Sequence, residues 1–180
     1  EKVIPLAEGN VLEVGVGTGL NLPFYDSNKI IKVTAIDPSL ETWEKRVVDI
    51  TQLPYDFEYI QAPAEDLPFE DNSFDNVVIT YSLCTIPDTA SALKEIRRVL
   101  KKEGNLIFCE HGAAPDIKVK RAQDLMNPIW NPLSGGCNLN RNISEIIENN
   151  GFKIQNLQKM YIPGFKFFSY NYWGTAQKTI

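Results

Sequence analysis

The sequence contains few cysteines, one histidine and no long hydrophobic run. Cys84, Cys109 and Cys137 form no CxxC pair and cannot all pair with one another, which indicates a reducing, cytoplasmic setting. Cys84 and Cys137 could act as nucleophiles or metal ligands, but buried structural cysteines are commoner. Because these cysteines and His111 are scattered along the chain, we expect no metal site. No apolar run approaches the roughly 20 residues that span a bilayer.

Positive charge is also in short supply. There are 18 lysines and arginines against 23 acidic residues, so the net charge is -5. This argues against nucleic acid as the main partner, because phosphate binding favours a basic face. The 180 residues suit one domain and leave the oligomeric state open. The first residue is Glu1 and not a methionine, so we expect preceding sequence, with any targeting signal, to be missing.

Short apolar runs alternate with helical patterns as far as residue 110. We predict strands at 10–16, 32–37, 57–61, 74–81 and 105–110. We predict helices from about residue 20, from 39 to 51, and from 88 to a stop at Gly104. Strand and helix in alternation predict a parallel sheet covered on both faces.

The pattern changes after residue 111. Residues 112–141 are interrupted by prolines and glycines, and we predict only a short helix near 119–126 in this segment, which would cap the substrate side. Its apolar side chains either pack on the sheet or form one wall of a pocket. The chain then closes with a predicted helix at 143–150 and two predicted strands at 152–160 and 166–177.

A glycine-rich turn follows the first predicted strand. Gly15, Gly17 and Gly19 form a GxGxG pattern just after Glu13. Glycines let a ligand approach the backbone, and a helix N-terminus presents free N–H groups. The dinucleotide fingerprint GxGxxG serves a pyrophosphate, but here the third glycine comes one residue early. An acidic strand end suits the ammonium of a methionine moiety better than a pyrophosphate.

Two further acids follow other predicted strands. Asp37 ends the second strand, where a carboxylate in doubly wound folds accepts hydrogen bonds from ribose hydroxyls. Alternatively Asp37 caps the following helix, although Pro38 and Ser39 make that role dispensable. Asp66 follows the third strand and either accepts a hydrogen bond from an amine such as adenine N6 or is a solvated loop acid.

Four motifs occur in the order and spacing of a known family: VLEVGVGTG, AIDPS, AEDLPFEDNSFDNVV and EIRRVLKKEGNLIF. Together they resemble class I methyltransferases of the UbiE-like group. The resemblance covers nearly the whole chain and implies one domain, residues 1–180, without its N-terminal lead helix. It implies an α/β fold with a Rossmann-like, doubly wound seven-stranded sheet of order 3-2-1-4-5-7-6, in which strand seven is antiparallel.

The same resemblance implies that S-adenosylmethionine is the cofactor and binds above strands one and two. The glycines would line its methionine part, and Asp37 would hold the ribose. Asp66, with its two neighbours, would frame the adenine, and Tyr81 would lie near the departing methyl group. The implied cofactor site comprises Glu13, Gly15, Gly17, Gly19, Asn21, Asp37, Pro38, Ser39, Glu65, Asp66, Leu67, Tyr81 and Ser82.

The second half carries a narrower resemblance. SLCTIPDTASALKEIRRVL, CEHG and NPIWNPLSGGCNLNR are similar to the methyltransferase-like protein 7 group of thiol methyltransferases. This implies a small, partly apolar acceptor with a thiol as the best candidate. A lipid head-group amine or a quinone-type ring is the enzyme alternative, and a non-catalytic cofactor-binding module that supports a partner is another. Human members of the group have a membrane-anchoring N-terminal segment, so membrane association stays open.

His111 is the candidate catalytic residue. It ends the fifth predicted strand, on the ligand side of such a sheet, where an imidazole could act as a general base on the acceptor. The alternative is that His111 orients the Gly112 loop by hydrogen bonds.

Overall fold

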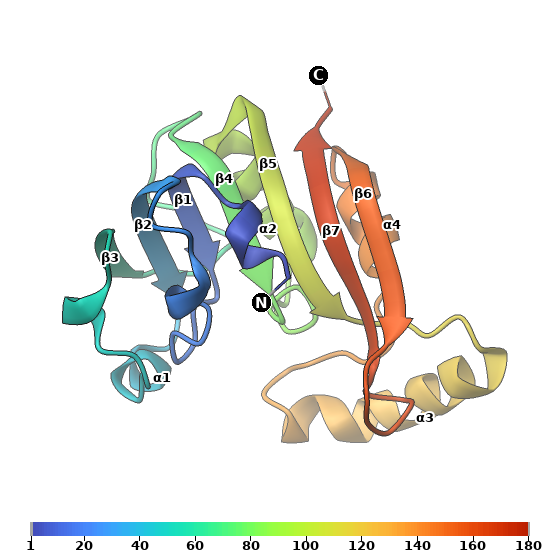
Figure 1. Cartoon of the computed structure of the whole chain (residues 1–180). Helices are drawn as coiled ribbons and strands as arrows, with labels where there is room; N and C mark the ends of the chain where they lie inside the picture. Colours follow the sequence, from blue (N-terminus) through green and yellow to red (C-terminus); the bar gives the residue numbers. More distant parts are fainter. Residues whose placement is uncertain (1, 180) are drawn as a thin grey trace.

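The computed structural model describes residues 2–179, which build one seven-stranded sheet (Figure 1). Its order is β3-β2-β1-β4-β5-β7-β6. β7 pairs antiparallel with β5 and β6, and the other neighbours pair parallel. The expected fold class, strand order and direction of strand seven are therefore confirmed. The strands are β1 (Gly9–Val14), β2 (Ile30–Asp37), β3 (Asp56–Gln61), β4 (Phe74–Thr80), β5 (Leu100–His111), β6 (Phe152–Tyr161) and β7 (Tyr170–Lys178).

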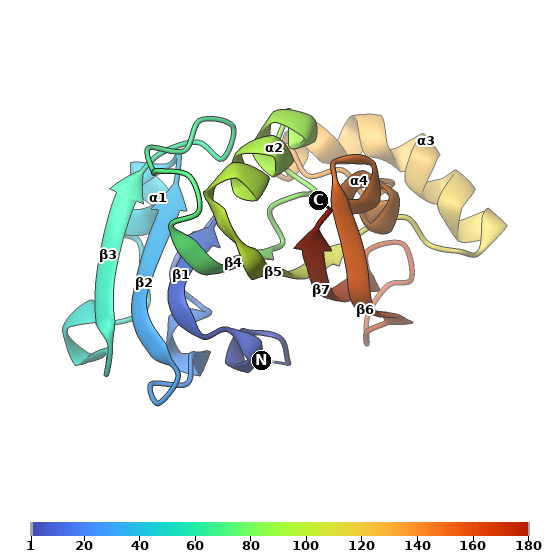
Figure 2. The same cartoon turned by 90° about the horizontal axis from the view of Figure 1, so that it is seen from above.

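Helices cover the sheet unequally. In Figure 2, α2 and α4 lie on one face and the N-terminal segment lies on the other. The helices are α1 (Leu40–Glu44), α2 (Thr89–Val99), α3 (Ile117–Leu133) and α4 (Ile143–Asn149), with single 3-10 turns η1 (Ile4–Leu6), η2 (Leu22–Phe24) and η3 (Ile50–Gln52). Among residues 2–179, no helix is both long and apolar enough to cross a membrane.

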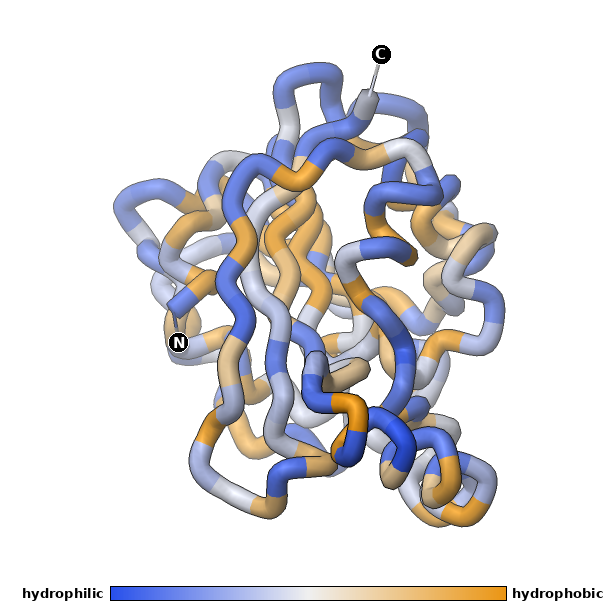
Figure 3. The backbone as a smooth tube through the Cα atoms, turned by 90° about the vertical axis from the view of Figure 1, so that its right-hand side faces the viewer, coloured by the Kyte–Doolittle hydropathy of each residue, from blue (hydrophilic) through white to orange (hydrophobic). Residues whose placement is uncertain are grey.

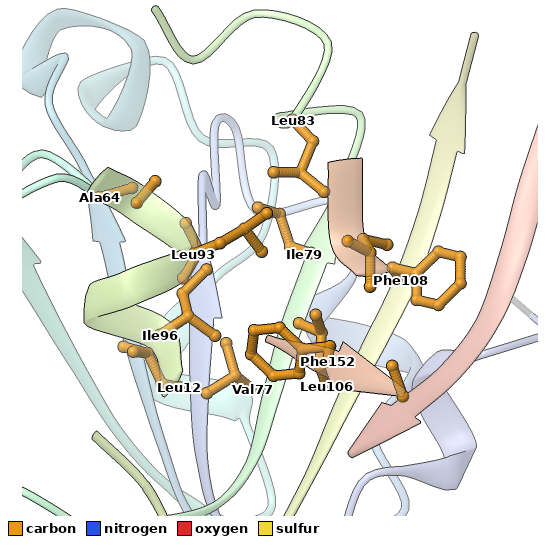
Figure 4. Packing of buried hydrophobic residues seen from close by; sticks show 14 of the residues in the cluster. Leu12, Ala64, Val77, Ile79, Leu83, Leu93, Ile96, Leu106, Phe108 and Phe152 are labelled. Atoms are coloured by element: carbon orange, nitrogen blue, oxygen red, sulfur yellow. The ribbon is translucent and has the colours of Figure 1, made fainter. Parts of the chain in front are cut away.

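The main core lies between the sheet and α2 with α4. Asp88 caps α2 by accepting the N–H groups of Ala90 and Ser91, and the buried residues of α2 recur at helical spacing. Leu93 and Ile96 of α2 face Leu12 of β1 in this core (Figure 4). A second buried cluster, which includes Val11, Ile107 and Trp173, covers the opposite face of the sheet. Central strands buried on both faces are continuously apolar, and Figure 3 shows apolar segments gathered in the middle of the sheet.

Two predicted helices in the first half are wrong in length. The helix from residue 20 is only the single turn η2, and the helix over 39–51 is reduced to α1 and η3. The chain leaves α1 because the Val47 N–H donates to the carbonyl of Thr18 in the glycine turn, 3.1 Å away. A tertiary hydrogen bond therefore overrides the helical pattern.

The junction of α2 and β5 also differs from the prediction. α2 ends at Val99, and β5 begins at Leu100, so Gly104 lies inside a strand and does not end a helix. A Cβ on Gly104 would lie 2.7 Å from the carbonyl oxygen of Asp75. This glycine is therefore required by the close approach of two backbones.

α3 is longer than predicted, because it continues through Pro128 and Pro132. Proline removes a helical hydrogen bond, but Asn127 and Asn131 hold the segment that follows the helix. The Asn127 side chain accepts the N–H of Leu139, and the Asn131 amide donates to the carbonyl of Gly136. The final predicted strand, in contrast, starts later, at Tyr170, because a turn occupies residues 165–168.

Candidate cofactor and acceptor site

The glycine turn leaves the end of β1 with backbone angles that suit glycine. Gly15, Gly17 and Gly19 have φ values of 74°, 54° and 81°, which lie in the left-handed region. A Cβ on Gly15 would collide with Ser82 Oγ, whereas one on Gly17 would meet nothing within 4 Å. Packing therefore excludes a side chain at Gly15, and open space lies above Gly17.

Asp37, at the end of β2, joins this turn to α1. Its Oδ2 accepts the N–H of Gly17 at 3.0 Å, and its Oδ1 accepts the N–H of Ser39 at 2.8 Å. Ser39 is the N-cap of α1, because its hydroxyl accepts the N–H of Thr42. The alternative that Asp37 caps the helix is therefore wrong. Each carboxylate oxygen retains a lone pair that could accept a further hydrogen bond.

A cavity of about 700 Å³ opens at the carboxyl ends of β1, β2 and β4. In open α/β sheets this is where ligands bind. Most of the predicted cofactor residues line it, namely Gly15, Gly17, Asn21, Asp37, Pro38, Ser39, Glu65, Tyr81 and Ser82. The lining also includes residues that the sequence analysis missed, among them Ala62, Thr80, Thr85 and Pro87. Thr85 and Pro87 lie within the motif SLCTIPDTASALKEIRRVL, whereas Ala62 and Thr80 lie in none of the motifs and are found only from their place at the ends of β3 and β4.

Glu13 does not line the cavity but lies beneath it. Its carboxylate is buried, where it accepts hydrogen bonds from the amide of Asn21 at 2.9 Å and the hydroxyl of Tyr25 at 3.0 Å. Burial outweighs these two hydrogen bonds and raises the pKa of Glu13 to about 7. Asn21 also donates to Thr80 Oγ1 at 2.8 Å. Glu13 thus orients Asn21, and its direct contact with a methionine ammonium stays a prediction.

The remaining predicted residues lie outside the cavity. Gly19, Asp66 and Leu67 are not in its lining. Asp66 is exposed, and Leu67 is buried in the main core. The backbone of Leu67 is fixed because Glu95 accepts its N–H at 3.1 Å and Arg98 donates to its carbonyl at 2.9 Å. Glu65 is the acid of this loop that lines the cavity.

A second cavity, of about 460 Å³, adjoins the first. Asn21, Thr80 and Tyr81 line both. The other side chains around the second cavity are mostly apolar and include Met160 and Trp173. The structure thus places two mostly apolar cavities on either side of the same three residues.

Tyr81, which lines both cavities, has an uncommon backbone conformation. Its φ of 51° is left-handed, which is rare for a bulky side chain. Its hydroxyl donates to Asn171 Oδ1 at 2.8 Å, and its N–H donates to the carbonyl of Cys109 at 2.9 Å. Backbone strain of this kind gathers at functional sites.

His111 lines neither cavity. Its ring packs edge-on against Tyr81, with centroids 6.2 Å apart, and its Nε2 lies 2.9 Å from Cys137 Sγ. Within the described residues, Nδ1 is buried without a hydrogen-bond partner. His111 therefore makes no hydrogen bond to the Gly112 loop there, and the bracing alternative is not supported. Its role as a general base stays a prediction.

The Cys137–His111 contact changes the proton affinity of both groups. Burial opposes a charge on His111, but the hydrogen bond to Cys137 and the nearby Cys137 and Glu110 charges outweigh it and raise the pKa of His111. A hydrogen bond from Cys84, and then the contact with His111, lowers the pKa of Cys137 despite burial. The same contact with Cys137, together with burial, raises the pKa of Cys84.

The expectation that the cysteines and the histidine are scattered is wrong for three of the four. The sulfur atoms of Cys84 and Cys137 and a ring nitrogen of His111 all lie within 4.8 Å of one another. They come from the segment after β4, the end of β5 and the loop after α3. These segments meet at one end of the sheet, which no local pattern in the sequence could reveal.

The fold and this site together define a class. An open α/β sheet with a glycine turn after β1, a carboxylate at the end of β2 and a cavity above both is typical of Rossmann-like proteins that bind a nucleotide-type cofactor.

The family model described as a methyltransferase domain matches residues 12–108. This is more than half of the 180 residues, so the chain belongs to the methyltransferase domain family. The resemblance found in the sequence is thereby confirmed.

Named relatives act on different acceptors. The human thiol S-methyltransferase TMT1B is 34% identical over 87% of this chain and 66% of its own length. A demethylmenaquinone methyltransferase of Clavibacter sepedonicus is 30% identical over 68% of this chain and 49% of its own length. A phosphatidylethanolamine N-methyltransferase of Cereibacter sphaeroides is 36% identical over 58% of this chain and 52% of its own length. This chain therefore spans about half to two thirds of the length of these relatives.

Solved structures agree on the fold. A SAM-dependent methyltransferase from Methanosarcina mazei has a TM-score of 0.72 at 22% identity and covers 95% of this chain and 92% of its own. Geranyl diphosphate methyltransferase in complex with SAM has a TM-score of 0.75 at 15% identity and covers 96% of this chain and 79% of its own. At these identities the likeness is one of fold.

Proposed function

We propose that the protein binds S-adenosylmethionine in the 700 Å³ cavity and transfers its methyl group to a small, partly apolar acceptor in the 460 Å³ cavity, with a thiol as the best candidate. The observation that carries this proposal is the junction of the two cavities at Asn21, Thr80 and Tyr81. Two ligands seated in adjoining cavities can react without leaving the protein.

The first cavity suits the cofactor in size and chemistry. Its volume lies within the range of about 300–1,000 Å³ that is typical of small-molecule sites. The open space above Gly17 allows a ligand to approach the backbone. Asp37 would accept hydrogen bonds from the ribose hydroxyls, Glu65 would face the adenine, and Asn21 would lie near the methionine part. When bound, the cofactor supplies an activated methyl group on a sulfonium.

The protein contributes mainly position. The nucleophile must lie in line with the methyl group at about 3–3.5 Å, and the leaving thioether needs no acid catalyst. Tyr81 lines both cavities and Ser82 lines the first, and both would fix this alignment. A thiol must also lose its proton, and its ordinary pKa of about 8.5 leaves only a small thiolate fraction at neutral pH.

The charge of the second cavity favours a thiol over an amine. The described residues that line it include Lys2 but no aspartate or glutamate. A cationic head group would lack a counter-charge there. A neutral thiol needs none, and Lys2 could balance the charge of a thiolate. The thiol S-methyltransferase name of the human relative supports the same acceptor class. The quinone and lipid relatives supply the alternatives.

The test is an acceptor screen with methyl-labelled S-adenosylmethionine. Alkyl thiols, primary amines and phenols are offered separately, and label transfer is measured by mass spectrometry. We expect transfer to thiols above the other classes. Transfer to amines or phenols alone would contradict the thiol assignment, and cofactor binding without turnover of any acceptor would favour the non-catalytic alternative.

A further inference from the structure

The geometry points to a metal site: we propose that Cys84, His111 and Cys137 bind one thiophilic divalent ion of the zinc class and leave a fourth position open for the acceptor thiol. The metal site stands on the geometry of these three side chains. The role of the fourth position rests on the proposed function.

The three side chains offer donor atoms that suit such an ion. Two cysteine sulfurs and one imidazole nitrogen, all within 4.8 Å of one another, are ligands that zinc prefers. A tetrahedral zinc ion holds sulfur and nitrogen ligands about 3.5–3.8 Å apart. From the 2.9 Å between Cys137 Sγ and His111 Nε2, the pair needs to open by roughly 0.6–0.9 Å.

The segment that carries Cys84 is held firmly in place. The buried carboxylate of Glu110 accepts the N–H groups of Ser82, Leu83 and Cys84 at 2.8, 3.0 and 3.3 Å. The guanidinium of Arg141 donates to the carbonyl of Leu83 in the same segment. Two different elements therefore fix the loop after β4.

The loop that carries Cys137 is tied to the same segment. Asn138 donates to the carbonyl of Cys84 twice, from its backbone N–H at 2.8 Å and from its side-chain amide at 3.0 Å. Asn127 and Asn131 of α3 both donate to Asn138 Oδ1. Metal sites need such support, because the partners of the ligands set ligand orientation.

Three protein ligands are the number found in catalytic zinc sites, which keep one position for water or substrate. None of the three side chains lines either cavity, but residues in contact with them do. Cys84 Sγ lies 3.5 Å from the hydroxyl of Thr85, which lines that cavity, and the His111 ring contacts Tyr81 at its junction with the second cavity. A thiol in the open position would release its proton to solvent and bind as a thiolate, since a coordinating thiol is deprotonated outright.

The test uses metal-free, reduced protein without cofactor or acceptor. Cobalt(II) is added first, because its tetrahedral thiolate complexes absorb visible light, and zinc(II) is then added in competition. We expect one ion per chain and a tetrahedral spectrum that zinc removes. An absence of this spectrum in the wild type would overturn the proposal without any variant.

Variants locate the ion. Cys84→Ser, Cys137→Ser and His111→Gln should each lower the affinity at least 100-fold, whereas the matched control Cys109→Ser, which removes the remaining cysteine, should bind as the wild type does. Circular dichroism identifies any variant that fails to fold. Unchanged affinity in folded Cys137→Ser or folded Cys84→Ser would contradict the site.

A second measurement separates this inference from the proposed function. Zinc-loaded and metal-free proteins are compared for methyl transfer to one alkyl thiol, and transfer should be faster with zinc. If zinc binds as expected but no thiol is methylated, the acceptor assignment fails while the metal site stands. If thiols are methylated and no ion binds, the metal site fails alone.

Discussion

The cofactor cavity and the cysteine–histidine cluster lie close together but are built in opposite ways. The cavity depends on a backbone turn and on a carboxylate 20 residues further along, Asp37, that accepts the N–H of Gly17. The cluster depends on three side chains that the fold brings together from positions 84, 111 and 137. Local backbone requirements leave a pattern in the sequence, whereas a meeting of distant loops leaves none.

Gly17→Val should abolish cofactor binding. Its side chain would enter the open space of the first cavity, at a backbone position with a φ of 54°. We expect at least a 100-fold loss of affinity for S-adenosylhomocysteine, measured by calorimetric titration. Gly151→Val is the matched control, because Gly151 also has a positive φ, of 84°, but lies outside both cavities.

Both valine variants should lose stability by about 1–2 kcal/mol, because each forces a side chain into left-handed backbone. Only Gly17→Val should lose the cofactor. Equal binding by the two variants would mean that the glycine turn serves the fold and not the ligand.

Asp37→Ala should weaken cofactor binding strongly, but less than Gly17→Val does. It removes the acceptor of the Gly17 and Ser39 N–H groups, together with the proposed ribose contact. Loss of hydrogen bonds to a charged group costs about 1.5–3 kcal/mol, or roughly 10- to 150-fold in affinity. Asp26→Ala, at an aspartate outside both cavities, is the control. Affinity like that of the wild type in folded Asp37→Ala would place the ribose elsewhere.

Glu13 should make stability depend on pH. Burial raises its pKa in the folded protein to about 7, from an ordinary value of 4.5. The folded state therefore binds this proton more tightly, so the stabilisation is complete below about pH 4.5 and is lost as the pH rises through 7. The slope from this one group is at most about 1.4 kcal/mol per pH unit. Urea unfolding at several pH values should show a shallower decline for Glu13→Gln, and parallel curves would show that Glu13 titrates normally.

Met160→Ala should have the smallest effect, and this effect should be confined to binding of the acceptor. Met160 lines only the second cavity and is 45% exposed. Removal of part of an apolar wall should raise the KM for the acceptor a few-fold, with cofactor affinity unchanged. Met126→Ala is the control, because Met126 is 40% exposed on α3 and lines neither cavity. A changed cofactor affinity in Met160→Ala would mean that the two cavities do not divide the ligands as proposed.

The sequence predicted the sheet well because ordered motifs mark where its strands and turns lie. It predicted α1 poorly, since the hydrogen bond from Val47 to Thr18 ends the helix early. It also placed too much weight on Pro128 and Pro132, which α3 accommodates. In each case the missing information is a contact between residues that are distant in the sequence or outside the pattern.

The candidate site shows the same limit. The glycines and Asp37 could be found from position alone, and the structure places Gly15, Gly17 and Asp37 around one cavity. The pairing of Glu13 with Tyr25 could not be found from the sequence, because no local pattern marks either residue before the fold buries them together. The distance between Cys84 and Cys137 depends on where the loop after α3 lies. It cannot be predicted from the spacing of the two cysteines in the sequence.

The most direct test of the cofactor site is a calorimetric titration of the wild-type protein with S-adenosylhomocysteine and, separately, with NAD. The glycine turn, Asp37 and the cavity predict one S-adenosylhomocysteine per chain and no heat from NAD. At a hundred times its dissociation constant, the bound ligand should add about 2.7 kcal/mol of stability and raise the melting temperature. Binding of NAD without binding of S-adenosylhomocysteine would contradict the account.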